Sequence, residues 1–143
     1  MALPEPESGL VISYSYLWRN EHRAGKREGA KNRPCAIVLV VKDESDGRKK
    51  VTVAPITHTP PANPDAAIEV PPKVKQHLGL DSKRSWIILD DFNEFIWPGY
   101  DLRPISGGTG KYAYGFLPPA LFKQMVGKIL ETRQKGLAMT SRD

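Results

Sequence analysis

The fold is decided by Arg33-Pro34-Cys35-Ala36-Ile37-Val38-Leu39-Val40-Val41 and by the run Val51-Thr52-Val53-Ala54-Pro55-Ile56-Thr57-His58. The first run is uncharged after its arginine and rich in β-branched residues, which predicts a central strand covered on both faces. The second run alternates and ends in polar groups, which predicts a partner strand. Asp46-Gly47 lies between them and favours a hairpin, because the tight turn requires positive φ. We therefore predict antiparallel pairing of 34–41 with 49–57, which brings Arg33 beside Thr57 and His58.

The rest of the chain indicates short strands separated by Gly and Pro turns. We expect strands over 10–18, 66–70, 85–90 and 94–97, and a short helix from Pro71 or Pro72 through Leu78. We interpret Asp90-Asp91 as a strand end rather than as catalytic carboxylates. A longer helix is predicted near the end of the chain, entered at Pro118-Pro119 and ended by Gly136. Its apolar stripe consists of Leu121, Phe122, Met125, Val126, Ile129 and Leu130.

These elements predict a mainly β (α+β) protein, either a small β barrel or a strongly bent sheet, with a helix laid across it. We expect a disordered leader over 1–8, a single domain over 9–136 and a flexible tail over 137–143. The 143 residues suffice for one core, and the formal net charge of +5 favours anionic partners only mildly.

Composition excludes several classes of protein. The single cysteine, Cys35, lies inside the most apolar strand and is expected to be a core residue rather than a nucleophile. No signal peptide and no apolar run of about 20 residues is present, so we expect a cytoplasmic protein that does not enter membranes. His22, His58 and His77 are dispersed and show no metal-ligand spacing. We therefore expect no metal site.

Residues 19–32 form a long polar segment with Gly25 and Gly29 as breakers. A loop of this length in a compact domain is more often functional than merely connective. The segment carries Glu28 and an excess of basic residues, and it leads directly into Arg33.

These features, taken in order, resemble the MazF/PemK/Kid family. Gly9 opens the first strand, Glu28 stands five residues before Arg33-Pro34, and an apolar strand follows at once. Val53-Ala54-Pro55-Ile56-Thr57 is similar to the family's Pro-Ile-Thr signature. The likeness covers about residues 9–59 and returns in the helix after Gly115-Phe116-Leu117. The chain departs from the family in having His58 where many relatives have serine, and in its longer, more basic first loop.

The resemblance implies a toxin of a bacterial toxin–antitoxin pair, built as a homodimeric SH3-like barrel of the CcdB/Kid/MazF type. It implies sequence-selective cleavage of single-stranded RNA without metal or cofactor, and growth inhibition that a cognate antitoxin relieves. The family's functional arginine, threonine and loop glutamate would be Arg33, Thr57 and Glu28. The antitoxin is expected to be acidic and partly disordered, and to fold over the same groove.

The expected chemistry is attack of the 2′-hydroxyl on the adjacent phosphorus, which leaves a 2′,3′-cyclic phosphate and a 5′-hydroxyl. Arg33 would stabilise the phosphate charge and Thr57 would donate a hydrogen bond to it. Glu28 or His58 would be the base, and His58 or His22 the acid. Trp18 is our candidate for stacking on a base. The residues expected to track the RNA backbone are Lys26, Arg27 and Lys31.

Two other functions remain open from the sequence. A CcdB-like toxin would bind DNA gyrase without catalysis, and would be expected to use the terminal helix and its exposed apolar residues. A catalytically silent RNA-binding barrel would need Arg33 for affinity alone. Arg33 and Thr57 favour the nuclease over the gyrase-binding toxin.

Overall fold

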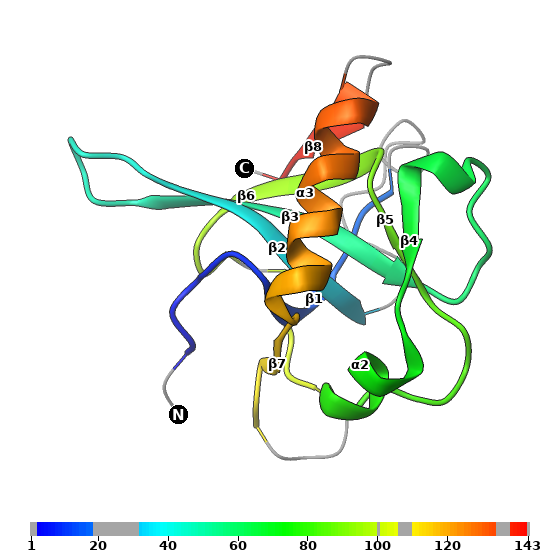
Figure 1. Cartoon of the computed structure of the whole chain (residues 1–143). Helices are drawn as coiled ribbons and strands as arrows, with labels where there is room; N and C mark the ends of the chain where they lie inside the picture. Colours follow the sequence, from blue (N-terminus) through cyan, green and yellow to red (C-terminus); the bar gives the residue numbers. More distant parts are fainter. Residues whose placement is uncertain (1–2, 19–31, 100, 106–109, 134–137, 143) are drawn as a thin grey trace.

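The computed structural model describes residues 3–18, 32–99, 101–105, 110–133 and 138–142. Within these residues it contains eight strands and two α-helices, arranged as a curled, mainly antiparallel sheet with one long helix across it (Figure 1). In chain order the elements are β1 (Leu10–Ser15), β2 (Asn32–Lys42), β3 (Lys49–Thr57), a 3₁₀ turn η1 (Pro64–Ala66), β4 (Ala67–Glu69), α2 (Pro72–His77), β5 (Trp86–Ile88), β6 (Asp91–Ile96), β7 (Ala113–Phe116), α3 (Pro119–Arg133) and β8 (Ala138–Ser141).

The sheet runs β4-β5-β3-β2-β1-β7, and β6 pairs with β3 and with β8. The predicted hairpin of β2 and β3 is confirmed, and Gly47 adopts a φ of +74° in its turn. The edge of β3 away from β2 is divided: Lys50–Val53 pair with β6, whereas Ile56 and Thr57 pair with β5. Because one strand has two partners on the same side, the sheet must curl at the point where they change. The curled sheet agrees with the strongly bent sheet that the sequence predicted.

The core consists of two apolar clusters on opposite faces of the central strands. Residues alternate between them: Val11 and Ala36 lie in the cluster beneath α3, while Ile12, Cys35 and Ile37 lie in the other. Tyr14 of β1 belongs to this second cluster, where it stacks on Phe95 with ring centroids 4.8 Å apart. Cys35 is fully buried, as expected for a core residue.

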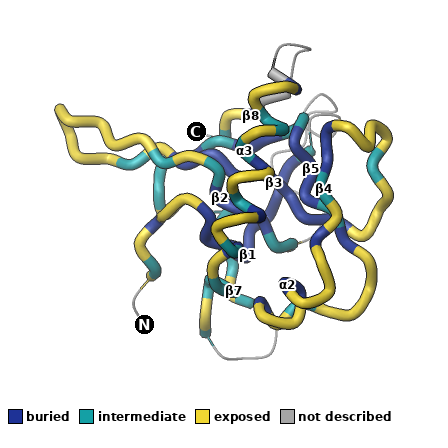
Figure 2. Tube along the Cα trace, in the orientation of Figure 1, coloured by how far each residue is buried: buried dark blue, intermediate teal, exposed yellow. Residues whose placement is uncertain are grey.

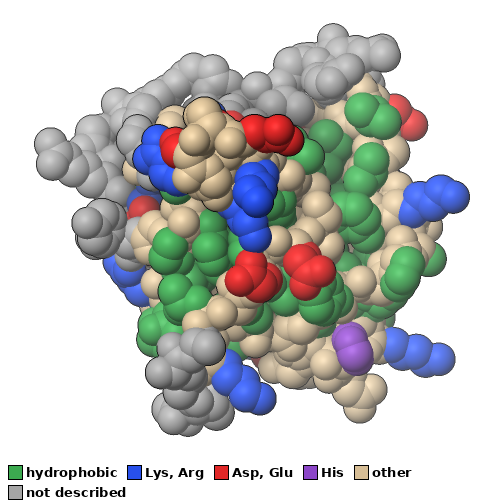
Figure 3. All heavy atoms as spheres, turned by 90° about the vertical axis from the view of Figure 1, so that its left-hand side faces the viewer, with side chains coloured by type: hydrophobic (Ala, Val, Ile, Leu, Met, Phe, Trp, Pro, Cys, Tyr) green, Lys and Arg blue, Asp and Glu red, His purple; other side chains and the backbone are tan. Residues whose placement is uncertain are grey.

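The prediction of a doubly covered strand is correct only for the first half of β2. Cys35 to Ile37 are fully buried, but Leu39 and Val41 are 52% and 50% exposed. The register of the hairpin shifts between Ile37 and Leu39, and beyond this bulge the hairpin leaves the body of the protein (Figures 1 and 2). The physical reason is length, because an eleven-residue strand outruns the core that the other strands form. Figure 3 shows the face of the molecule from which the hairpin projects, and on it hydrophobic side chains lie between charged ones.

The two predicted helices are present. Short helix α2 has Pro72 in its first turn and is followed by Gly79 with a φ of +70°, as the sequence indicates. In α3, Leu121 and Met125 are buried against the sheet. Leu130 continues the stripe but is 52% exposed, so the helix extends past the surface it covers. None of the helices in the described residues is long and apolar enough to cross a membrane.

The ends of the chain are more closely attached than the sequence suggests. Where we expected a flexible tail, β8 pairs in parallel with β6 and the next residue, Arg142, has a side chain only 3% exposed. Its guanidinium contacts the backbone oxygen of Ser15, the amide oxygen of Asn93 and the carboxylate of Asp101. Within the expected leader, Glu5 forms an ion pair with Lys49.

Candidate functional site

The hairpin brings Arg33 and Thr57 together as predicted. Cys35 pairs with Pro55, and continuing this register places Arg33 opposite Thr57. Residues directly opposite in an antiparallel pair share one face of the sheet. Both side chains line two adjoining pockets, one of about 330 Å³ and one of about 660 Å³. Arg33 and Thr57 therefore stand at the boundary between the two pockets.

Arg33 is held by an aromatic ring rather than by a carboxylate. Its guanidinium carbon lies 5.1 Å from the ring centroid of Trp18, which in turn makes an edge contact with Tyr16. Within the described residues Arg33 forms no ion pair, and its buried Nε has no hydrogen-bond partner. An unpartnered buried donor is costly unless something binds it. This arrangement suits an anion that approaches the guanidinium.

Thr57 is positioned to donate a hydrogen bond. Its side chain is largely buried at the end of β3, where its backbone also pairs with β5. Its Oγ1 accepts a hydrogen bond of 3.1 Å from the backbone N–H of Thr59. Because a hydroxyl that accepts still has its own proton to donate, this contact orients the hydroxyl without using its donor.

The larger pocket adds two carboxylates that sequence reasoning had assigned to a strand end. Asp90 and Asp91 line it together with Trp18, Arg33 and Thr57. Burial raises the pKa of Asp90 above its usual value. Asp91 instead accepts a hydrogen bond of 2.5 Å from the hydroxyl of Tyr16, and burial with the nearby Asp91 charge raises the pKa of that tyrosine strongly.

Asp90 is therefore the candidate that the sequence analysis missed. It lies two residues after the end of the apolar strand β5, and an acidic pair just after a buried strand is the available signal. What the sequence lacked was the pairing of β5 with the end of β3, which carries Asp90 into the pocket of Arg33.

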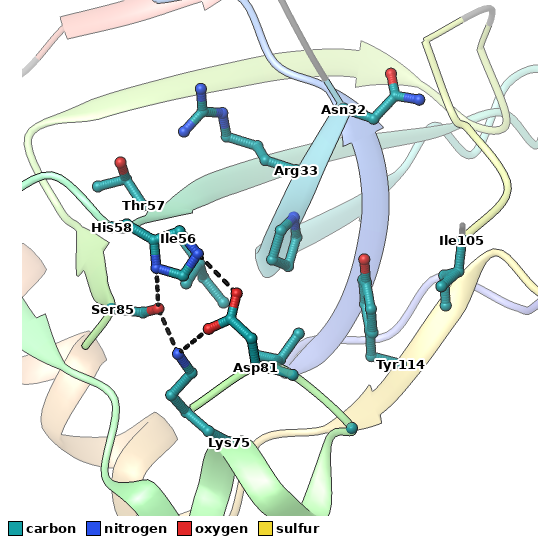
Figure 4. Close-up of a pocket in the computed structure, with 13 residues that line it drawn as sticks. Asn32, Arg33, Ile56, Thr57, His58, Lys75, Asp81, Ser85, Ile105 and Tyr114 are labelled. Atoms are coloured by element: carbon teal, nitrogen blue, oxygen red, sulfur yellow. Dashed lines mark hydrogen bonds and ion pairs between the residues drawn. The ribbon is translucent and has the colours of Figure 1, made fainter. Parts of the chain in front are cut away.

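The smaller pocket has a hydrogen-bonded ring of four side chains on its wall (Figure 4). The imidazole Nε2 of His58 lies 2.8 Å from Asp81, and Nδ1 lies 3.0 Å from the hydroxyl of Ser85. Lys75 closes the ring by donating to Asp81 and to Ser85, at 2.8 and 2.7 Å. Both ring nitrogens of His58 therefore face partners within the protein.

Five candidate residues lie outside the described part of the chain. These are His22, Lys26, Arg27, Glu28 and Lys31, so their predicted roles stay predictions. Within the described residues, no three His, Cys, Asp or Glu side chains are grouped in a way that could hold a metal ion.

The chain matches no family model, no curated protein and no solved structure. The fold and site by themselves define a mainly β protein with a curled antiparallel sheet, which carries an arginine between two pockets.

Proposed function

We propose that the protein is a metal-independent endoribonuclease that cleaves single-stranded RNA, built on a small SH3-like barrel. The observation that carries this proposal is the position of Arg33, a cation without a carboxylate partner in the described structure, between two pockets and opposite Thr57. An arginine fork fits a phosphate group, and flanking pockets suit the bases on either side of it. The sequence resemblance to MazF/PemK/Kid toxins supports the same function independently.

In this proposal Arg33 and Thr57 stabilise the negative charge of the transition state. The 2′-oxygen of the substrate attacks phosphorus, and the bond to the 5′-oxygen of the next nucleotide breaks. The guanidinium of Arg33 compensates the added negative charge on the phosphate oxygens, and the hydroxyl of Thr57 donates to one of them. Both groups are fixed by strand pairing before the substrate arrives, which reduces the cost of ordering them.

The proton transfers require a base and an acid. We assign the base to Asp90, because it lines the same pocket as Arg33 and because burial raises the pKa of its carboxyl above its usual value, which makes the carboxylate a stronger base. Both ring nitrogens of His58 are engaged, so it is a weaker candidate for the base, and Glu28 remains an alternative. The departing 5′-oxygen takes a proton from an imidazole, and His22 is the stronger candidate for this acid, because both ring nitrogens of His58 are engaged.

The biological setting follows from the resemblance. We place the nuclease in a toxin–antitoxin pair, as a homodimer whose acidic antitoxin covers the groove around Arg33. The net charge of +5 is compatible with both an RNA substrate and an acidic partner.

The deciding experiment incubates purified protein with mixed-sequence single-stranded RNA in EDTA. We expect discrete products that end in 2′,3′-cyclic phosphate and 5′-hydroxyl. Arg33→Ala should lower the cleavage rate by about 10²–10³-fold, the range typical for loss of a group that stabilises transition-state charge. The matched control is Arg48→Ala, an exposed arginine paired with Asp46 in the hairpin loop, which should cleave like the wild type. Intact RNA with a folded wild-type protein would refute the proposal.

A second candidate is a toxin that binds DNA gyrase without catalysis. The observation in its favour is Leu130, a large apolar side chain that stays 52% exposed on α3. Under this alternative, Leu130→Lys would abolish capture of gyrase, and Arg33→Ala would have no effect on growth inhibition. Under our proposal, Arg33→Ala relieves growth inhibition and Leu130→Lys does not.

A further inference from the structure

The smaller pocket lies between an aromatic side chain and a hydrogen-bonding wall. Tyr114 stands on one side of it, and the pair of Asp81 and His58 stands on the other (Figure 4). Asn32 lies at its rim, one residue before Arg33. Its volume of about 330 Å³ is at the lower end of the range for small-molecule sites, and this suits a single nucleotide unit.

Asp81 is fixed in this wall as an ionised acceptor. The amine of Lys75, whose side chain is only 5% exposed, binds one carboxylate oxygen, and the backbone N–H of Lys83 binds the same atom. His58 binds the other oxygen. The hydrogen bond from Lys75 is the main reason that the pKa of Asp81 lies below its usual value. An ionised carboxylate has about four acceptor positions. Three are occupied, so roughly one remains for a ligand.

The charges around the pocket favour different groups at different places. Within the pocket the carboxylate of Asp81 is paired with the ammonium of Lys75, so the wall carries little net charge and suits a neutral, hydrogen-bonding group. At the mouth a phosphate meets Arg33, which forms no ion pair within the described residues, and Thr57, and both residues border the two pockets. The phosphate is therefore best placed at the boundary, and the neighbouring base enters the smaller pocket. A base with an exocyclic amino group offers the N–H that the remaining position of Asp81 can accept. Uracil offers one ring N–H between two carbonyl oxygens, which would bring an acceptor against the carboxylate.

We propose that this pocket binds the unstacked base next to the cut phosphate and selects adenine, cytosine or guanine over uracil. Asp81 accepts a hydrogen bond from the exocyclic amino group, Asn32 contributes a second polar contact and Tyr114 stacks on the base. Lys75, Ser85 and His58 are positioning residues that hold the carboxylate in place. This inference rests on the proposed function for the identity of the ligand, and it adds the determinants of sequence choice.

The first test maps every cut in a randomised RNA by sequencing the product ends. For the wild type we expect one position beside the cut at which amino-bearing bases exceed uracil about tenfold, the effect of one charge-assisted hydrogen bond. Asp81→Asn should lower this preference to about twofold or less, because its amide can also donate to a uracil carbonyl. Asn32→Ala, a change at an exposed residue, should weaken the preference at the same position. The control Asp46→Asn, at the hairpin turn, should leave the pattern unchanged.

A second test measures binding apart from cleavage. Oligouridines with 2′-O-methyl groups lack the attacking hydroxyl, and one internal uracil is replaced by adenine, cytosine or guanine. Each is titrated into the protein while backbone amide signals are followed by NMR. We expect tighter binding of the substituted oligomers, with the largest shifts at Asn32, Asp81 and Tyr114.

The two tests separate failure of the inference from failure of the proposed function. Preferential binding at these residues without any cleavage of natural RNA would remove the nuclease and keep the base pocket. Cleavage with no base preference at any position, or with a preference that both Asp81→Asn and Asn32→Ala leave intact, would overturn the base pocket and keep the nuclease. The amide spectrum of Asp81→Asn shows whether this variant folds. If Asp81→Asn does not fold, the base preference of Asn32→Ala decides the test.

Discussion

At the scale of single residues, the site contains polar side chains that are buried at a cost in stability. Arg33 is buried at Nε without a hydrogen-bond partner in the described structure and lies over Trp18. Asp90 is half-buried, and burial raises the pKa of its carboxyl. Each arrangement costs stability in the free protein, and ligand binding or catalysis is the usual reason that such costs persist.

The hydroxyl of Thr57 provides the first prediction at this scale. Thr57→Val keeps the shape of the side chain and removes the donor, so cleavage should fall about 10- to 100-fold, as for loss of a hydrogen bond to a charged group. Thr57→Ser keeps the hydroxyl and should retain most activity. Rates are measured under single-turnover conditions. Equal activity of Val and Ser variants would mean that Thr57 serves only as the acceptor for Thr59.

Asp90 gives a prediction for activity and its pH dependence. As the base, it must be ionised, so cleavage should rise with pH through its raised pKa. Asp90→Asn should lower the rate by about 10²–10⁴-fold and remove this limb of the pH profile. The profile is measured from pH 4 to 8 for both proteins. A variant with the same pH limb as the wild type would assign the base to another group, such as Glu28.

Asp90→Asn should raise the stability of the protein at neutral pH, although it lowers activity. A raised pKa means that the folded state binds the proton of Asp90 more tightly than the unfolded state does. Its contribution to stability is therefore complete below the unfolded pKa, about 3.9, and is lost as pH rises through the folded value. Asp90→Asn should thus have a higher free energy of unfolding than the wild type at pH 7, with a smaller difference at pH 3. Urea titrations at the two pH values measure this, and a destabilised variant at pH 7 would contradict it.

At the scale of secondary-structure elements, β3 and β8 organise the molecule. β3 pairs with β2 along one edge and with both β6 and β5 along the other, which places Thr57 and Asp90 in a single pocket. β8 adds to the outer edge of β6, and Arg142 beyond it connects β1, β6 and Asp101. β8 and Arg142 therefore stabilise β6, which lies on the side of β3 away from its hairpin partner β2.

Arg142 should carry a large share of that stability. Arg142→Met removes an ion pair whose side chains are 3% and 16% exposed, together with two further hydrogen bonds, so we expect a loss of about 3–5 kcal/mol. Arg48→Met removes the exposed pair with Asp46 and should change the free energy of unfolding by less than about 1 kcal/mol. Urea denaturation measures both. Equal, small losses would show that the contacts of Arg142 contribute little to the fold.

At the scale of the whole molecule, the protein combines a modest positive charge with a concave site and a projecting hairpin. The net charge of +5 attracts RNA in general, while the pockets around Arg33 provide the places for phosphate and bases. The long-range attraction is screened by salt, but base contacts within the pockets are screened far less.

Salt dependence separates these contributions. The affinity for a 2′-O-methyl RNA should fall as salt rises, with a log–log slope of about −0.7 for each phosphate contact on a single strand. Arg33→Ala should make the slope shallower by about 0.7, the loss of one contact, whereas Arg48→Ala should not change it. Fluorescence anisotropy between 50 and 300 mM salt measures the slopes. An unchanged slope for Arg33→Ala would show that Arg33 does not contact phosphate.

Much of the fold was predictable where the pattern is local. Asp46-Gly47 fixed the hairpin, the apolar stripe from Leu121 fixed the long helix, and Gly79 ended the short one. The hairpin also predicted that Arg33 would lie beside Thr57 and His58. The bulge between Ile37 and Leu39 shifts the register by one residue, and this shift places Thr57 rather than His58 opposite Arg33. The exposed Leu39 was not predictable, because apolar residues show that a strand can be buried but not how far the rest of the core extends.

Local propensity and turn chemistry thus determined the order of strands and helices along the chain, and with it the closeness of Arg33 to Thr57 and His58, because these depend on neighbours in the sequence. Only the tertiary structure decided that Asp90 shares a pocket with Arg33, that Lys75 and His58 hold Asp81 in the wall of a second pocket, and that Arg142 is buried beside Asp101. These contacts join residues far apart in the chain. They form because closing a curled sheet brings its strand ends together, a geometric consequence that no local stretch of sequence contains.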